Sequence, residues 1–269
     1  MTAATYLFVP GNRPERFAKA LDSDADAVIL DMEDAVAAGG KAAARVAIGQ
    51  WCAQEATQRA RLVLRINDHT TPWFADDLAL LRATGIPVAM LPKTEAPEHV
   101  ARVMAELPRG GAVIPIIETA RGVLHVDAIA AAGGVQRLAF GTLDYAVDLD
   151  LSGDERGLIY AASRMAIASK AAGLASPIAG VTPALDDEER LRADVALARA
   201  CGFGAKLCIH PRQVAIVRQL LAPTPAELDW ARRVLAAAED NPGAFQIDGK
   251  MVDRPVILKA RALVERAPK

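Results

Sequence analysis

The residues of this sequence that could do chemistry are carboxylates and cations placed where short apolar runs end. Glu118 closes the run in "PIIETARG", and Asp144 follows the run in "LAFGTLDYA". Arg65 and Lys93 hold similar places after two earlier runs. The set lacks the paired nucleophile and base that covalent catalysis requires. Acids gathered with fixed cations instead favour a site for a divalent metal ion and an anionic substrate.

A metal ion would explain why several acids gather at one place, because a hard cation relieves their mutual repulsion. Mg²⁺ typically takes one or two protein carboxylates, together with waters and substrate oxygens. Glu118 and Asp144 follow consecutive runs at equivalent positions, so they form the best pair for direct ligation. The acids of "DMED" (Asp31, Glu33 and Asp34) could hold waters bound to such an ion. Either member of the pair, taken alone, fits a helix N-cap or a loop charge equally well.

Arg65 supports two interpretations that the sequence leaves open. It lies in "RLVLRIN", just past buried residues, where an unpaired charge is costly. It either forms an ion pair with a neighbouring acid such as Glu33, or binds a substrate carboxylate in a bidentate fork. His210 in "CIHP" has no evident relay partner and is interpreted as a hydrogen-bonded structural histidine. The "AGGK" stretch that ends at Lys41 is too short for a phosphate loop and is interpreted as a hinge before a helix.

Eight short apolar runs must position these residues. Each is rich in Val, Ile or Leu, which is typical of a strand buried on both faces, and a helical pattern follows each run. Eight strand–helix units in series predict a (β/α)8 TIM barrel, whose active site lies at the carboxyl ends of the strands. A doubly wound open sheet is the rival, but no G-x-G-x-x-G follows the first run. The runs are "TYLFVP", "AVILDME", "RLVLRIN", "PVAMLPK", "AVIPIIET", "QRLAFG", "SPIAGVT" and "AKLCIHP".

A further segment follows the eighth unit. The stretches "TPAELDWARRVLAAAED" and "RPVILKARALVERA" predict two helices, and the Asp-Gly of "QIDGK" predicts a tight turn between them. We therefore expect a barrel catalytic domain over residues 1–222. A C-terminal helical extension over residues 223–269 would act as a lid and contribute to a neighbouring subunit's site.

Composition excludes several classes of protein. Of the 269 residues 52% are apolar, and the formal net charge is −2, so no basic surface for nucleic acid is expected. The start of the chain has no basic leader, and no apolar run reaches the roughly 20 residues of a membrane span. The three cysteines show no metal-binding spacing, and an odd count fits a reducing compartment. We expect a cytoplasmic protein that binds neither nucleic acid nor membranes.

The motifs at the strand ends resemble those of the citrate lyase beta-subunit-like proteins, within the HpcH/HpaI aldolase superfamily of CoA-ester lyases. The resemblance implies a (β/α)8 barrel that binds Mg²⁺, with Mn²⁺ as the alternative ion, and that acts on a carbon–carbon bond of a CoA thioester. It also implies a homotrimer or a dimer of trimers. The matching pieces run in order over nearly the whole chain: "LFVPGNRPERFAKA", "AVILDMEDAV", "VLRIN", "MLPKTE", "IIETARGV", "AFGTLDYAVDL", "CIHPRQV" and "GAFQIDGKMVDRPV".

The resemblance also implies roles for single residues. Glu118 and Asp144 resemble the family's two metal ligands, and Glu33 resembles the acid that supports a water bound to the metal. Arg65 resembles the arginine that contacts the carboxylate or keto oxygen of the substrate. Asp253 in "GKMVDRP" resembles the C-terminal acid that acts as the catalytic acid or base.

Five further residues are implied to bind substrate. Lys93 occupies the lysine of the family's "LPK" motif. The backbone of Gly141, Thr142 and Leu143 suits the carboxylate of a 2-oxo acid, since turn amides can cradle an anion. Arg13, in the "PGNRPERF" stretch after the first run, is a candidate for the phosphates of coenzyme A.

The resemblance implies cleavage of a 3-hydroxyacyl-CoA, such as citramalyl-CoA or malyl-CoA, into acetyl-CoA and a 2-oxo acid, or the reverse condensation. Three alternatives stay open at this point. They are a thioesterase on the same scaffold, a beta subunit that acts on an acyl-carrier-protein thioester, and a non-catalytic binding subunit. The retained acids and Arg65 argue against the last.

Overall fold

The computed structural model describes residues 3–54, 58–241 and 243–267. The chain divides into two compact units. The first, Thr2–Val217, is named the barrel unit, and the second, Arg218–Lys269, is named the C-terminal unit. Within the described part of the chain, no helix has both the length and the apolar character needed to cross a membrane.

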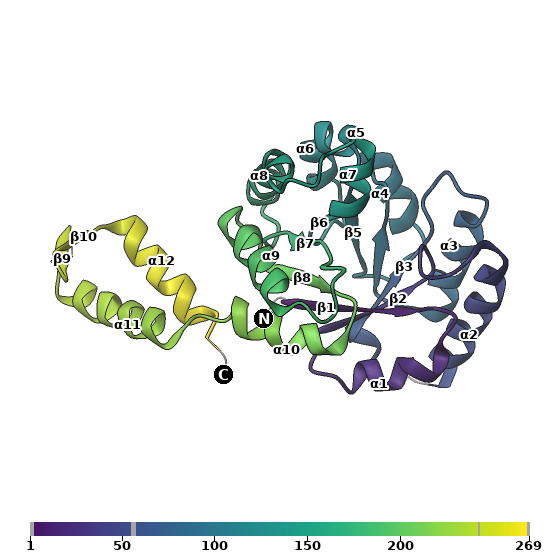
Figure 1. Cartoon of the computed structure of the whole chain (residues 1–269), viewed down its shortest axis with the longest axis horizontal. Helices are drawn as coiled ribbons and strands as arrows, with labels where there is room; N and C mark the ends of the chain where they lie inside the picture. The colour runs from purple at the N-terminus through teal and green to yellow at the C-terminus, as the bar shows by residue number, and fades with distance from the viewer. Residues whose placement is uncertain (1–2, 55–57, 242, 268–269) are drawn as a thin grey trace. The chain divides into compact units, whose positions relative to one another are not determined.

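Eight parallel strands close the barrel in sequence order (Figure 1). The last strand returns to the first, with Tyr6 opposite Leu207, so the sheet has no open edge. The predicted (β/α)8 barrel is confirmed, and the open doubly wound sheet is wrong. The strands are β1 (Thr5–Pro10), β2 (Ala27–Asp31), β3 (Leu62–Arg65), β4 (Val88–Leu91), β5 (Ala112–Ile117), β6 (Ala139–Phe140), β7 (Ile178–Ala179) and β8 (Ala205–Cys208).

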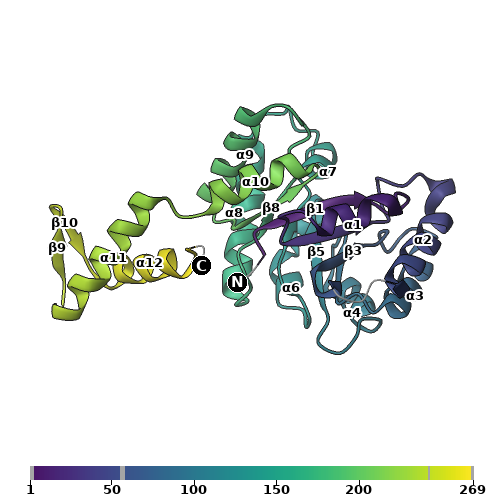
Figure 2. The same cartoon turned by 90° about the horizontal axis from the view of Figure 1, so that it is seen from below.

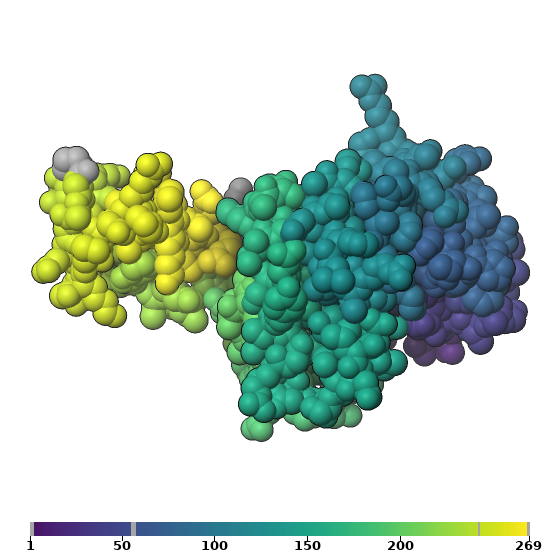
Figure 3. All heavy atoms as spheres, turned by 90° about the horizontal axis from the view of Figure 1, so that it is seen from above, coloured from purple at the N-terminus to yellow at the C-terminus, as the bar shows by residue number. Residues whose placement is uncertain are grey.

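Helices form a layer outside the strands (Figures 1 and 2). In the space-filling view, the heavy atoms of the barrel unit, coloured purple to green, form a closely packed surface on the face turned to the viewer (Figure 3). Its α-helices are α1 (Phe17–Leu21), α2 (Lys41–Gln54), α3 (Phe74–Thr84), α4 (Pro97–Met104), α5 (Ala120–Leu124), α6 (Val126–Ala130), α7 (Thr142–Asp148), α8 (Arg156–Ala171), α9 (Glu188–Ala200) and α10 (Pro211–Leu221). Single 3-10 turns lie at η1 (Pro14–Arg16), η2 (Ala38–Gly40) and η3 (Arg59–Arg61).

The strands are mainly apolar because both of their faces are buried. Alternate side chains, among them Ile29 and Met90, fill the inside of the barrel in one buried cluster. Their neighbours along the strands, such as Val28 and Leu30, are also fully buried. Since successive side chains of a strand point to opposite faces, these neighbours pack outward against the helical layer. Charged residues gather where strands β2 to β5 end, which is at the mouth of the barrel.

The C-terminal unit is a pair of helices joined by a hairpin. It contains α11 (Pro225–Asp240), β9 (Phe245–Ile247), β10 (Lys250–Val252) and α12 (Arg254–Glu265). The predicted Asp-Gly turn joins β9 to β10, with positive φ angles at Asp248 (51°) and Gly249 (73°). Positive φ at both central residues is what a tight two-residue hairpin requires. Apolar side chains of α11, β10 and α12 form one cluster.

Candidate active site

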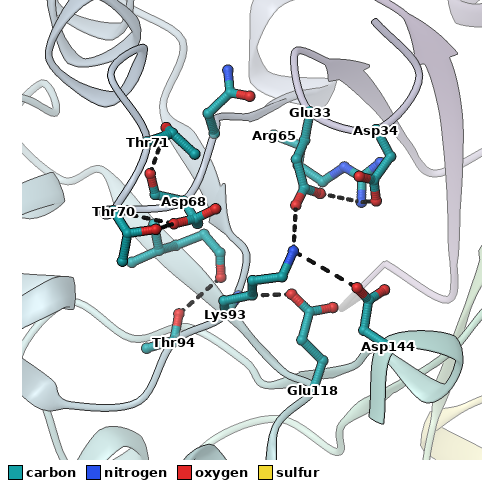
Figure 4. A network of polar contacts seen from close by, with 12 residues as sticks. Glu33, Asp34, Arg65, Asp68, Thr70, Thr71, Lys93, Thr94, Glu118 and Asp144 are labelled. Carbon is teal, nitrogen blue, oxygen red and sulfur yellow. Dashed lines mark hydrogen bonds and ion pairs between the residues drawn. The ribbon is translucent and has the colours of Figure 1, made fainter. Parts of the chain in front are cut away.

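The carboxyl ends of five consecutive strands bring the predicted polar residues together. Glu33 follows β2, Arg65 ends β3, Lys93 follows β4, Glu118 follows β5, and Asp144 lies in the first turn of α7 after β6. Figure 4 shows the side chains of Glu33, Lys93, Glu118 and Asp144 pointing toward one shared space. The strand-end prediction therefore placed five residues from distant parts of the sequence in one network.

A cavity of ≈ 380 Å³ opens beside this network. Its polar wall includes Arg65, Glu118 and Asp144, and its apolar wall includes Phe8 and Ile116. A second cavity of ≈ 220 Å³ has a mainly apolar lining and extends between α8 and α9. The two cavities share four lining residues, which are Phe140, Thr142, Leu143 and Val181. The first cavity is the one lined by residues of the strand-end network, Arg65, Glu118 and Asp144, and it is the candidate substrate site.

Arg65 is held by two acids at once. Its Nε and Nη2 atoms donate to the two oxygens of Asp31, each at 2.7 Å, which is a bidentate fork. Its Nη1 atom lies 2.7 Å from an Oε atom of Glu33, and its guanidinium lies over the ring of Phe8, 4.7 Å from the centroid. The ion-pair interpretation is confirmed, with Asp31 as the fork partner and Glu33 as a second partner. A substrate contact by Arg65 stays a prediction.

Asp31 is the residue whose role the sequence interpretation missed. It was grouped with acids that could hold water, but it is 1% exposed and locked against Arg65. The signal was available in the order of the strands, because Asp31 stands directly opposite Arg65 in the parallel register of β2 and β3. Asp31 also accepts a hydrogen bond from the backbone amide of Glu33 at 2.9 Å, so it orients the loop that carries Glu33.

Lys93 links the acids of the mouth. Its Nζ atom lies 3.3 Å from Oε1 of Glu33 and 3.7 Å from Oδ1 of Asp144, and its backbone amide donates to Oε1 of Glu118 at 2.7 Å. Burial lowers the pKa of Lys93, but the charges of these three carboxylates outweigh it and raise the pKa above its usual value. Lys93 has a positive φ of 45°, a conformation uncommon outside glycine that often marks functional sites.

Glu118 and Glu33 hold protons more tightly than exposed acids do. Burial raises the pKa of Glu118 to about 8, and the charge of Glu33 acts in the same direction. Burial also raises the pKa of Glu33 to about 7, although Arg65 favours its ionised form. A cation next to Glu118 would offset this cost of ionisation. Perturbed acids in a cavity are a recognised feature of functional sites.

The donor set fits Mg²⁺ better than a metal that needs an all-protein cage. Across residues 3–54, 58–241 and 243–267, no group of three or more His, Cys, Asp or Glu side chains could by itself hold a metal ion. Glu118 and Asp144 offer two carboxylates that face the same space beside the cavity (Figure 4). Mg²⁺ binds through one or two carboxylates and keeps room for water and substrate oxygens.

Comparison with known proteins shows the family of the chain. The sequence profile described as HpcH/HpaI aldolase/citrate lyase matches residues 4–211. The chain belongs to this family. Within it, the chain is 38% identical to the citrate lyase subunit beta-like protein of Deinococcus radiodurans, over 96% of this chain and 95% of that protein. It is 32% identical to a (3S)-malyl-CoA thioesterase of Cereibacter sphaeroides, over 97% of this chain and 93% of that protein.

A solved structure from the same family matches both units of the chain. It is CitE from Mycobacterium tuberculosis in complex with magnesium, acetoacetate and coenzyme A. The TM-score is 0.89 at 36% sequence identity, and the match covers 100% of this chain and 99% of that chain. This HpcH/HpaI family member therefore has a relative of the same fold that binds magnesium and a CoA compound.

The remaining predicted site residues lie in different places. Thr142 and Leu143 form the first turn of α7 and line both cavities. The short helix α7 itself was not predicted. Arg13 is exposed in the turn after β1 and pairs with Glu15 at 2.6 Å. Asp253 belongs to the C-terminal unit, where it caps α12 by accepting from the amide of Val256 at 3.3 Å.

His210 has the hydrogen-bonded character predicted for it. Its ring nitrogen Nδ1 accepts from the backbone amide of Arg212 at 3.2 Å. No catalytic relay is needed to explain this contact, because it closes the loop that leads into α10.

Gly141 leaves the space that the side chain of Glu118 occupies, in addition to its predicted contact with substrate. A Cβ atom at this position would lie 2.1 Å from Oε2 and 2.5 Å from Cβ of Glu118. We expect Gly141→Ala to displace the Glu118 carboxylate and weaken Mg²⁺ binding about tenfold or more, which is ~1.4 kcal/mol. Isothermal titration calorimetry measures it. Gly133→Ala is the control, since nothing lies within 4 Å of its added Cβ. Equal affinity in both variants would contradict the steric argument.

If Glu118 is a metal ligand, as predicted, Mg²⁺ binding should depend on pH through the pKa of this residue. Metal ligands must lose their protons to bind, and the metal-free protein holds a proton on Glu118 below a pH of about 8. The apparent affinity for Mg²⁺ should therefore rise between pH 6 and 8, by about tenfold per pH unit, and level off above that. Titrations in buffers of different ionisation enthalpy would also record proton release. Flat affinity over this range would show that Glu118 is already ionised or is not a ligand.

Proposed function

We propose that this chain is a Mg²⁺-dependent carbon–carbon lyase. It would cleave a 3-hydroxyacyl-CoA, such as citramalyl-CoA or malyl-CoA, into acetyl-CoA and a 2-oxo acid, or run the reverse condensation. The observation that carries the proposal is the convergence of Glu118, Asp144 and the Arg65 network on one cavity. The relative that binds magnesium, acetoacetate and coenzyme A supports the same cofactor and ligand class.

Glu118 and Asp144 would hold the ion, and the other mouth residues would keep it in place. Bound Mg²⁺, or Mn²⁺ as the alternative, would act as a Lewis acid toward the oxygens of the substrate. The backbone amide of Lys93 donates to the Glu118 carboxylate, and the Lys93 ammonium group lies 3.7 Å from the Asp144 carboxylate. These contacts would help to hold the Glu118 carboxylate, which follows β5, and the Asp144 carboxylate, in the first turn of α7, on the same side of the metal site.

The chain's own residues supply the proton transfers and the charge stabilisation. The C3 hydroxyl of the substrate loses its proton, the C2–C3 bond breaks as the C3 carbonyl forms, and the electron pair passes to the thioester enolate. Glu33, with a pKa of about 7, is suited to take the hydroxyl proton near neutral pH. Arg65 would stabilise the developing negative oxygens. Asp253, acting on a neighbouring subunit's site, would then deliver a proton to the enolate carbon.

The start of α7 is suited to the carboxylate of the 2-oxo acid. The amide of Gly141 already donates to the carbonyl of Ile117 at 3.1 Å, so it serves the barrel rather than a ligand. The amides of Thr142 and Leu143 belong to the first turn of the helix, where amides lack partners within the helix itself. Both residues line the cavity, which makes them the better candidates of the three.

Hydrolysis of the thioester is the second candidate, because a (3S)-malyl-CoA thioesterase is among the relatives. In that reaction the groups of the site would activate water instead of promoting enolate formation. The water oxygen would bond to the thioester carbonyl carbon, the C–S bond would break, and CoA would leave as the thiol. A panel of CoA thioesters with Mg²⁺, analysed by mass spectrometry, separates the two. Acetyl-CoA with pyruvate or glyoxylate indicates the lyase, and free CoA with an intact hydroxy acid indicates the thioesterase. Turnover that is restored only by an acyl-carrier protein would indicate the beta-subunit role. No turnover under any of these conditions would indicate the non-catalytic binding role.

A homotrimer or a dimer of trimers belongs to the same proposal. Analytical ultracentrifugation measures this oligomeric state.

A further inference from the structure

Lys41 is a buried lysine that the hinge interpretation of "AGGK" does not explain. It is the first residue of α2 and is 5% exposed. Its Nζ atom donates to the carbonyl of Met32 at 2.7 Å, to the carbonyl of Glu33 at 2.8 Å, and to Oδ1 of Asn67 at 2.7 Å. An ammonium group has three donors, so all three are used. Two of them hold the backbone of the segment that carries Glu33.

We propose, building on the function proposed above, that Lys41 is a positioning residue that fixes the direction of the Glu33 carboxylate. That carboxylate meets Arg65 at 2.7 Å and Lys93 at 3.3 Å. The amide of Glu33 is held by Asp31, and its carbonyl is held by Lys41. The Glu33 backbone is thus held at both its amide and its carbonyl, which sets where the side chain leaves the chain to reach Arg65 and Lys93.

A buried series of hydrogen bonds connects Lys41 to α3 through Asn67 and Asp77. The amide and the Nδ2 atom of Asn67 both donate to Oδ2 of Asp77, at 2.8 and 2.6 Å. Asp77 is fully buried, and Arg45 of α2 donates to its other oxygen at 2.9 Å. The Lys41 ammonium also lies over the ring of Trp73, 4.9 Å from the centroid. Residues of α2 and α3 thereby support the loop that follows β2.

Burying the charge of Lys41 is unfavourable for folding, so its presence favours a role beyond filling space. Burial lowers the pKa of Lys41, while Asp31, Glu33 and Asp77 act in the opposite direction. An apolar side chain of similar length would fill the volume without burying a charge. It could not bind three acceptors in three directions, which is what holding a loop for catalysis requires.

The test is Lys41→Met in two backgrounds. In the otherwise native protein, we expect kcat to fall about tenfold with KM changed less than about twofold, since misplacement by an ångström costs rate more than binding. In a Glu33→Gln background, we expect Lys41→Met to lower kcat by less than about twofold further, because residues acting through one group are not additive. An equal loss in both backgrounds, or no loss in the native one, would overturn the proposal.

Lys206→Met is the matched control. Lys206 is 2% exposed and donates to the backbone carbonyl of Gly180, so this variant also removes a buried ammonium group. We expect both variants to lower Tm, but Lys206→Met to leave kcat within about twofold of native. If Lys41→Met does not fold, Asn67→Ala removes one of its three acceptors and should give a smaller kcat loss with the same dependence on Glu33.

Hydrogen exchange reports how firmly Lys41 holds the loop and needs no turnover. It therefore tests the role of Lys41 separately from the proposed lyase function. The amides of Met32 and Val36 donate to the carbonyls of Arg65 and Glu33, which protects them. In Lys41→Met, a peptide over residues 28–40 should exchange about tenfold faster, while Lys206→Met leaves it unchanged. Unchanged exchange in Lys41→Met would overturn the inference even if the protein cleaves no thioester.

Discussion

Asp253→Asn is expected to lower kcat about 1,000-fold while the affinity for the CoA thioester stays within about threefold, as removal of a general acid does. Asparagine is the right substitution because Asp253 caps α12 through its side chain, and asparagine caps equally well. The loss can then be assigned to the missing proton and not to unwinding of the helix. Steady-state kinetics and calorimetric binding of the substrate measure the two quantities separately.

Asp248→Asn provides the control for Asp253. Asp248 lies in the hairpin turn of the same unit, is exposed, and pairs with Arg233. Asparagine tolerates the positive φ at this position, so the turn should persist. We expect native kcat in this variant. If Asp253→Asn turns over at the native rate, Asp253 has no part in the mechanism.

Glu118→Gln is expected to raise the Kd for Mg²⁺ at least about 100-fold and to remove turnover with it. The amide keeps the size of the side chain but lacks the charge that a hard cation requires. Because burial already disfavours the ionised carboxylate, the metal-free variant should be no less stable than the native protein. Titration calorimetry gives the Kd, and thermal unfolding in EDTA gives the stability.

Asp34→Asn is the control for Glu118. Asp34 lies at the same mouth, but its side chain is 66% exposed and reaches Arg65 only at 3.8 Å. Removing the Asp34 charge should leave the Mg²⁺ affinity within about twofold of the native value, because solvent screens exposed charges. Native Mg²⁺ affinity in Glu118→Gln would remove Glu118 from the metal site, whatever happens to turnover.

The barrel could be predicted from the sequence because burial on both faces of a strand leaves a continuous apolar run. That signal is strong at β1 and β5, and it also found β6 and β7, which have two residues each. It missed α7, since "TLDYAVD" is too short to show a helical period. The strand ends then located Glu33, Arg65, Lys93, Glu118 and Asp144, because parallel strands bring their carboxyl ends to one mouth.

Tertiary contacts decided what the sequence could not. Asp31 was visible as an acid, but its fork with Arg65 depends on the register of two strands. Lys41 looked like a hinge residue because its partner Asn67 is 26 positions away, on the loop after another strand. Neither contact, Asp31 with Arg65 or Lys41 with Asn67, leaves a pattern in the local sequence. The steric dependence of Glu118 on Gly141 is likewise a contact between two strand ends.

The most direct test of the central claim is the reaction of citramalyl-CoA or malyl-CoA in D₂O with Mg²⁺, followed by mass spectrometry. Cleavage through an enolate predicts acetyl-CoA that carries one deuterium in its methyl group, together with an equal amount of pyruvate or glyoxylate. EDTA and the Glu118→Gln variant should both abolish these products. Free CoA with an intact hydroxy acid and no deuterated acetyl-CoA would contradict the lyase and assign the site to thioester hydrolysis.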